Sequence, residues 1–123
     1  MAKNPVSWFE IYVDDMARAR KFYEEVLGVK LDSLPGPDIE MWAFPMEENG
    51  AGAAGSLVHM DGFKAGGNST LVYFACEDCA AEEGRVGAAG GTVFKSKFSI
   101  GQYGFIALAN DTEGNMFGLY SMK

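Results

Sequence analysis

The chain has 123 residues, of which 48% are hydrophobic and 22% are charged, with a formal net charge of −7. This length and composition are typical of one globular domain, which we expect to span residues 1–123. The acidic balance argues against a nucleic-acid or anionic-membrane partner, because both need clustered lysine and arginine. No apolar run approaches the ~18 residues of a membrane span, and the N-terminus has no signal-peptide pattern. The expectation is therefore a cytoplasmic protein.

The first half of the chain begins with a strand pattern followed by a helix pattern. Residues 6–13 place apolar side chains alternately on two faces, which predicts a strand. Asp14 or Asp15 then caps a helix whose apolar residues recur at three- and four-residue steps, and Gly28 ends it. Three more strands are expected near residues 29–31, 39–46 and 56–60.

The second half repeats this order after a linker at residues 61–69 that is rich in glycine and short polar residues. A strand is expected at residues 70–76, and a helix at residues 78–89. That helix is weaker, since each of its internal glycines costs about 1 kcal/mol relative to alanine. The last three strands are expected near residues 92–95, 103–109 and 115–121.

Equivalent positions of the two halves lie sixty-three residues apart, as Gly28 and Gly91 do. The sequence therefore predicts an α+β fold of two βαβββ modules, at about residues 5–60 and 70–122. A duplicated sheet of this kind curves around a cavity, so a ligand site is expected between or inside the modules.

The motifs of both modules resemble a known superfamily. Ile11-x-Val13-x-Asp15, Ala19-x-x-Phe22-Tyr23 and Leu27-Gly28-Val29 resemble the first unit of the vicinal oxygen chelate superfamily. That group holds glyoxalase I, bleomycin-resistance proteins and extradiol dioxygenases. Phe105-Ile106-Ala107 and Asp111-x-Glu113-Gly114-Asn115-x-Phe117-Gly118-Leu119 resemble the last two strands of its small glyoxalase-like members. The resemblance spans almost the whole chain and implies two curved mixed sheets and a homodimer.

The resemblance also indicates where a divalent cation would bind. In family members that use one, the ligands lie on the first and last strands of each module. Those positions here are Trp8, Leu71, Gly118, and either Gly55 or Ser56. Indole, aliphatic and glycine positions cannot coordinate a cation, and serine is a poor ligand. We therefore expect no metal and no cofactor, although a shift of two residues would bring in Glu10 and keeps a divalent metal as an alternative.

Glu10 is the polar residue of the first predicted strand and shares a face with Trp8 and Tyr12. Among aromatic rings, its carboxylate could act as a catalytic general base or as a hydrogen-bonding anchor. The alternative is a pair with a lysine or a hydroxyl at the sheet edge. His59 is the only histidine and either lines the cavity mouth or faces water.

Aromatic side chains and one acid form the candidate ligand site. The candidate ligand-binding residues are Trp8, Glu10, Tyr12, Trp42, Tyr73 and Tyr120. Rings on one face would stack a planar or apolar small molecule, and phenol hydroxyls would orient it. The same rings could instead fill the space between the modules or form a subunit contact.

Two short motifs indicate structure rather than chemistry. Cys76 and Cys79 form a C-x-x-C pattern, but the intervening acids disfavour a thiolate, so a structural pair of reduced thiols is expected. Residues 50–55 match the glycine pattern of dinucleotide-binding loops, but a strand pattern follows them instead of a helix, so a hairpin loop is expected.

Three functions remain consistent with the sequence. The first is a metal-independent protein that binds a small apolar or aromatic molecule, as the bleomycin-resistance branch does. The second is an enzyme: a divalent-metal-dependent lactoylglutathione-lyase-like or dioxygenase-like protein, or a metal-free isomerase with Glu10 as base. The third is an interaction module whose cavity face is an assembly surface.

Overall fold

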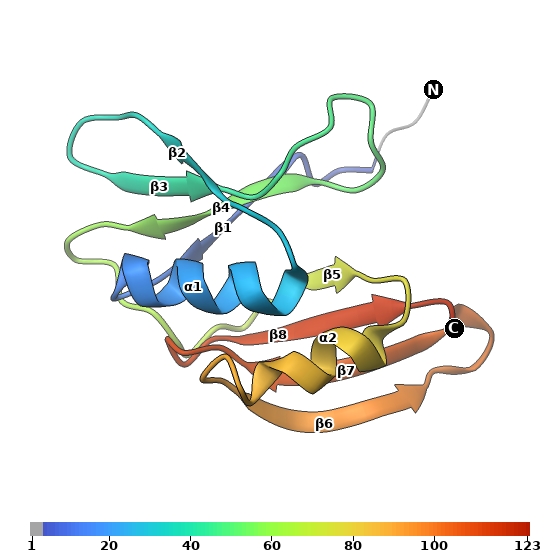
Figure 1. The fold of residues 1–123 in the computed structure, drawn as a ribbon. Helices are drawn as coiled ribbons and strands as arrows, with labels where there is room; N and C mark the ends of the chain where they lie inside the picture. Colours follow the sequence, from blue (N-terminus) through green and yellow to red (C-terminus); the bar gives the residue numbers. More distant parts are fainter. Residues whose placement is uncertain (1–3) are drawn as a thin grey trace.

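The computed structural model describes residues 4–123 (Figure 1). Two successive modules have the same order of one strand, one helix and three strands. The elements of the first module are β1 (Trp8–Tyr12), α1 (Met16–Leu27), β2 (Asp32–Leu34), β3 (Glu40–Ala43) and β4 (Ala54–His59). The elements of the second module are β5 (Tyr73–Ala75), α2 (Cys79–Val86), β6 (Thr92–Ser99), the short 3-10 helix η1 (Gly101–Tyr103), β7 (Phe105–Asn110) and β8 (Met116–Ser121).

Each module forms a four-stranded mixed sheet, in the orders β1-β4-β3-β2 and β5-β8-β7-β6. The first strand of each module pairs in parallel with the last one, and the neighbouring pairs are antiparallel. The predicted α+β fold of two βαβββ modules is confirmed. In Figure 1 the first sheet lies above the second, with α1 between them.

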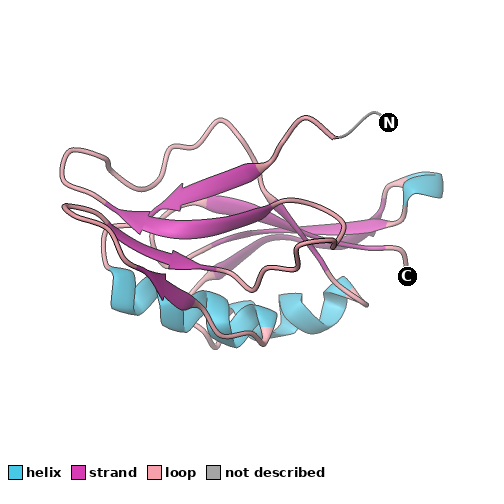
Figure 2. Ribbon diagram, turned by 90° about the horizontal axis from the view of Figure 1, so that it is seen from above, coloured by secondary structure: helices cyan, strands magenta, loops and turns pink. Residues whose placement is uncertain are grey.

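Helix α1 begins and ends as expected, whereas α2 ends at Val86, three residues before its predicted end at residue 89. Asp15 caps α1 by accepting a hydrogen bond of 3.0 Å from the backbone amide of Arg18, and Gly28 ends the helix with a φ of 67°. Asp78 caps α2 by accepting one of 3.0 Å from the amide of Ala80. Figure 2 shows both helices on the same side of the strands, so each sheet has one face covered by a helix layer.

Strand β2 begins three residues later than predicted. After α1, the amides of Val29 and Leu31 are bonded to Glu24, the first to its carbonyl at 3.2 Å and the second to its carboxylate at 3.0 Å. These contacts hold the chain against the helix end, so the sheet pairing starts only at Asp32.

Strand β6 is longer than predicted, because it continues to Ser99 instead of ending near Lys95. The register of its pairing with β7 shifts twice, once between Val93 and Lys95 and once between Lys95 and Phe98. Each shift breaks the alternation of apolar and polar side chains, which is the signal that marks a strand in a sequence.

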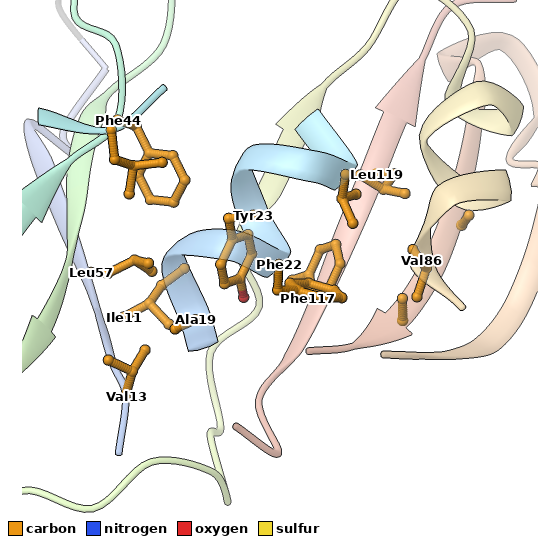
Figure 3. Packing of buried hydrophobic residues seen from close by; sticks show 14 of the residues in the cluster. Ile11, Val13, Ala19, Phe22, Tyr23, Phe44, Leu57, Val86, Phe117 and Leu119 are labelled. Atoms are coloured by element: carbon orange, nitrogen blue, oxygen red, sulfur yellow. The ribbon is translucent and has the colours of Figure 1, made fainter. Parts of the chain in front are cut away.

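One hydrophobic cluster joins the two modules. Phe22 and Tyr23 of α1 contact Phe117 of β8, with ring centroids 5.8 and 5.5 Å apart (Figure 3). Tyr23 also contacts Phe44 of the first module and Phe74 of the second at 5.7 and 5.9 Å. A helix of one module therefore completes the core of the other.

Candidate functional site

A cavity of about 300 Å³ lies where the two modules meet, between β1, the linker at residues 61–69 and the start of β8. We call it the junction cavity. Because β1 is an edge strand, side chains from both of its faces reach this space. Its lining consists of an apolar floor with polar groups at the rim: Phe9, Glu10, Ile11, Tyr12, Tyr23, Lys64, Gly66, Asn68, Ser69, Thr70, Val72, Asn115, Met116 and Phe117.

Glu10 and Tyr12 form a hydrogen-bonded pair at one side of the junction cavity. The Tyr12 hydroxyl donates a bond of 2.8 Å to Glu10 Oε1. This bond and, second, partial burial raise the pKa of Tyr12, so the phenol stays protonated. Phe63 of the linker stacks on the Tyr12 ring, with centroids 5.3 Å apart. Glu10 itself is exposed and bonds a hydroxyl on an edge strand, which is the alternative that the sequence left open for it.

The opposite side of the junction cavity is formed by the linker and is attached to β8. Asn68 donates to the carbonyls of Thr70 and Met116 at 2.8 and 3.0 Å and accepts a bond of 3.1 Å from the Met116 amide. The Gly66 amide donates to Asn115 Oδ1 at 2.7 Å. Lys64 lies on the same side, and within residues 4–123 it forms no ion pair.

The floor is held from below by a buried polar pair. The Tyr23 hydroxyl donates a bond of 2.6 Å to Asp111 Oδ2. Burial and the adjacent Asp111 charge hold the pKa of Tyr23 well above its usual value, so this phenol also remains a donor. Asp111 Oδ1 accepts the amides of Glu113 and Asn115 at 2.8 and 2.9 Å, which fixes the turn before β8.

Glu113 connects that turn to the start of α1. Its fully buried carboxylate accepts the backbone amides of Asp14 and Asp15 at 2.9 Å each, and Arg18 donates to it at 2.6 and 3.0 Å. Burial opposes ionisation of this carboxyl, but the bonds from Arg18, the two amides and Thr112 outweigh it and lower its pKa to about 2. We call this arrangement the Glu113 clasp.

Strand register shows which face each candidate aromatic residue occupies. Glu10 is opposite Ser56, Tyr73 is opposite Gly118, and Ala75 is opposite Tyr120. Their strand neighbours Leu57, Phe74 and Leu119 belong to the core cluster, so these residues and Trp8 lie on the sheet faces away from the core. We call these faces the outer face. Trp8 and Tyr73 are 36% and 45% exposed there, and neither they nor Tyr120 line the junction cavity.

Trp42 is separated from the other candidate aromatic residues. It is opposite Leu57 of β4 and therefore shares the helix-covered face of the first sheet. The Arg20 guanidinium lies 3.4 Å from the centroid of its ring, which is a cation–π contact. The structure thus brings together Glu10 and Tyr12 in the junction cavity, and places Trp42 under α1.

The register also decides between the two alternatives for one family-type metal position. Glu10 and Tyr73 are equivalent residues of the two modules, and their strand partners are Ser56 and Gly118. The position on β4 is therefore Ser56, whose buried hydroxyl has no hydrogen-bond partner within residues 4–123. One hydroxyl with Trp8, Leu71 and Gly118 does not fit a divalent cation. Across the described part of the chain, no group of three His, Cys, Asp or Glu side chains could hold a metal ion.

His59 and the two cysteines lie away from the junction cavity. His59 Nδ1 is 2.9 Å from the carbonyl of Val13, and the half-buried ring is not part of the cavity lining. Cys76 and Cys79 form no disulfide. These positions are consistent with structural roles for all three side chains.

Sequence reasoning missed the polar rim that the linker supplies. Lys64 and Asn68 lie in the linker, which has no periodicity, and Thr70 begins the segment that is predicted as a strand. Nothing in their own pattern indicates a site. The sequence pattern places Glu113 and Asn115 in a tight turn and indicates no further role for them. The one signal is that Glu113 has no basic neighbour in sequence, which favours an ion-pair partner from a distant part of the chain.

The start of the chain resembles a protein family in sequence, and the whole chain resembles a solved structure. Residues 6–41 match the family described as bleomycin resistance protein-like N-terminal. The antibiotic binding protein TnmS3 from Streptomyces sp. CB03234 has 27% sequence identity and a TM-score of 0.69, with 100% of this chain and 99% of that chain covered. The chain is a member of the vicinal oxygen chelate superfamily.

Other members of the vicinal oxygen chelate superfamily share the fold at lower identity. A glyoxalase/bleomycin resistance protein from Albidiferax ferrireducens T118 has 22% identity and a TM-score of 0.69, over 96% of this chain and 99% of that one. A glyoxalase I mutant from Zea mays has 21% identity and a TM-score of 0.76. This chain is covered to 95% but spans only 46% of the maize protein. No curated protein is significantly similar to the chain in sequence.

None of the helices in residues 4–123 is long and apolar enough to cross a membrane.

Proposed function

We propose that this protein binds a small apolar or aromatic molecule in the junction cavity, without a metal ion. The observation that carries the proposal is the combination of an aromatic floor with a polar rim in one cavity of about 300 Å³. Small-molecule pockets typically combine an apolar lining with a few convergent polar groups, and this volume is at the lower end of their range.

The chemistry of the rim supports binding and orientation. A planar ligand would lie against Phe9, Val72 and Met116, while Glu10 and Tyr12 on one side and Lys64 on the other contact its polar substituents. The similarity to an antibiotic binding protein supports a ligand of this class.

An enzymatic role has weaker support. The side chains at the family-type metal positions do not suit a divalent cation, which a lyase of the glyoxalase type would need. As a metal-free base, Glu10 would have to remove a proton, but its Oε1 already accepts the Tyr12 hydroxyl at 2.8 Å. This bond occupies one oxygen of the carboxylate, which favours an anchoring role for Glu10 over general-base catalysis.

Binding can be tested with neutral aromatic compounds of one to three fused rings, 2-naphthol among them, followed by amide chemical shifts in the presence of a chelator. We expect saturable shifts at Asn68 and Thr70. The substitution Val72→Phe fills the cavity and should weaken binding at least tenfold, whereas Thr92→Phe adds the same ring on the exposed strand β6 and should not. Shifts that Val72→Phe leaves unchanged, or that require added divalent cation, would contradict the proposal.

We further propose that the protein is a cytoplasmic homodimer with the outer face at the subunit contact. Two unbridged cysteines are consistent with a reducing compartment. The exposed aromatic rings of Trp8 and Tyr73 are consistent with an interface, where such residues are enriched. Sedimentation equilibrium should give twice the chain mass at micromolar concentration, and Tyr73→Glu should shift the protein to monomer. A monomeric parent protein would refute the dimer.

A further inference from the structure

A second cavity, of about 220 Å³, lies beside α2, and we call it the α2 cleft. Its lining is apolar except for one acid: Leu27, Val29, Phe44, Pro45, Phe74, Ala75 and Glu82. The rings of Phe44 and Phe74 separate it from the junction cavity, because they pack against Phe9 and Tyr23, which line that cavity, at 5.7 and 5.9 Å respectively. The α2 cleft is therefore a distinct space.

Glu82 carries an unsatisfied buried oxygen. Its side chain is only 16% exposed, and within residues 4–123 its Oε1 is buried without a hydrogen-bond partner. Its Oε2 is 3.9 Å from Arg85 Nη2, too long for a hydrogen bond. Arg85 instead donates from Nε and Nη2 to the carbonyl of Val26 at 3.0 and 2.8 Å. The nearest cation is thus engaged with the end of α1.

Glu82 lies in the first turn of α2, near the positive end of the helix dipole. Burial and, second, the charge of Glu82 raise the pKa of the neighbouring Cys76 thiol to about 12. That thiol donates to the carbonyl of Phe74 at 3.5 Å, and its weak interaction with Glu82 also contributes to the raised pKa. No nitrogen or oxygen donor of residues 4–123 lies within hydrogen-bond geometry of Glu82 Oε1.

We propose that the α2 cleft binds a small apolar molecule that carries a protonated amine. The ammonium group contacts the Glu82 carboxylate from the side of the cleft, and the hydrocarbon part lies against Leu27, Val29 and Phe74. A buried carboxylate oxygen without a donor is costly, so a cationic ligand gains both a charge-assisted hydrogen bond and apolar contact. The volume accommodates about one ring. The net charge of −7 also favours the approach of cations.

The test uses benzylamine and benzyl alcohol, which have the same shape but differ in charge at neutral pH. Each is titrated into the full-length protein while amide chemical shifts are recorded. We expect saturable shifts at Ala75 and Glu82, which line the α2 cleft, with benzylamine binding at least tenfold tighter than benzyl alcohol. Glu82→Gln should remove this preference. Glu25→Gln, which removes the same charge from an exposed site on α1, should preserve it.

Each other outcome overturns the inference. Equal affinity for the two probes in the parent protein, or in Glu25→Gln as well as in Glu82→Gln, would mean that Glu82 does not select a cation. Shifts confined to Asn68 and Thr70 would place the probes in the junction cavity. Absence of saturable shifts with 10 mM probe would mean that water, rather than a ligand, satisfies Glu82. None of these results bears on 2-naphthol binding in the junction cavity, so the two proposals can fail separately.

Discussion

Replacing Glu113 with alanine should lower the free energy of unfolding by about 2–4 kcal/mol, because each donor left without its acceptor costs about 1–3 kcal/mol. The substitution leaves the amides of Asp14 and Asp15 without their acceptor and removes the partner of Arg18. Urea denaturation followed by circular dichroism measures the change. Glu77→Ala is the matched control, because Glu77 is 88% exposed in its pair with Lys123 and should change stability little.

The contribution of Glu113 should also depend on pH. Its pKa is about 2 in the folded protein, below the ordinary value of 4.5. A lowered folded-state pKa means that the stabilisation is fully present above pH 4.5 and is lost as the pH falls through about 2. The stability difference between the parent protein and Glu113→Ala should therefore narrow as the pH falls from about 5 to about 2. A difference that stays constant over this range would rule out an ionised carboxylate as its source.

Replacing Phe117 with alanine should cost about 3–5 kcal/mol, the usual range for a large aromatic residue in a core. Phe117 is 1% exposed and contacts the rings of Phe22 and Tyr23 in α1 and of Phe74 in β5. The cavity left behind would loosen both modules at once. We propose on this basis that residues 1–123 form one domain, and expect a single unfolding transition at a lower urea midpoint.

The control for this substitution is Phe94→Ala in the same module. Phe94 is 63% exposed, so its removal should change the free energy of unfolding by less than about 0.5 kcal/mol. Two separate transitions in Phe117→Ala, one for each module, would contradict a shared core and favour two independent folding units.

The order of strands and helices could be predicted because the local signals agree with the tertiary structure. Asp15 and Gly28 are the expected cap and stop residues, and the apolar stripe of α1 is the buried one. The strands were predicted less well where register shifts or capping contacts interrupt the alternation, as in β6 and before β2. The register shifts of β6 depend on its pairing with β7, and the delay of β2 depends on a single side chain of α1, so strand alternation alone indicates neither.

The candidate site was predictable only in part. Strand alternation placed Glu10 and Tyr12 on one face, and the structure has them hydrogen-bonded at the junction cavity. The face of Trp42 depends on its pairing with β4, and the rim residue Lys64 depends on the path of the linker. Neither follows from composition or spacing, because both are set by contacts between segments far apart in sequence.

The position of the linker outside the core determines which residues can be substituted without loss of stability. The fold is held by the shared core and the Glu113 clasp, whereas Lys64 and Ser69 line the rim of the junction cavity and belong to neither. Substitutions at such exposed linker positions usually cost little stability. Substitutions at a few surface positions can therefore change the polar groups at the rim of the junction cavity, while the fold stays the same.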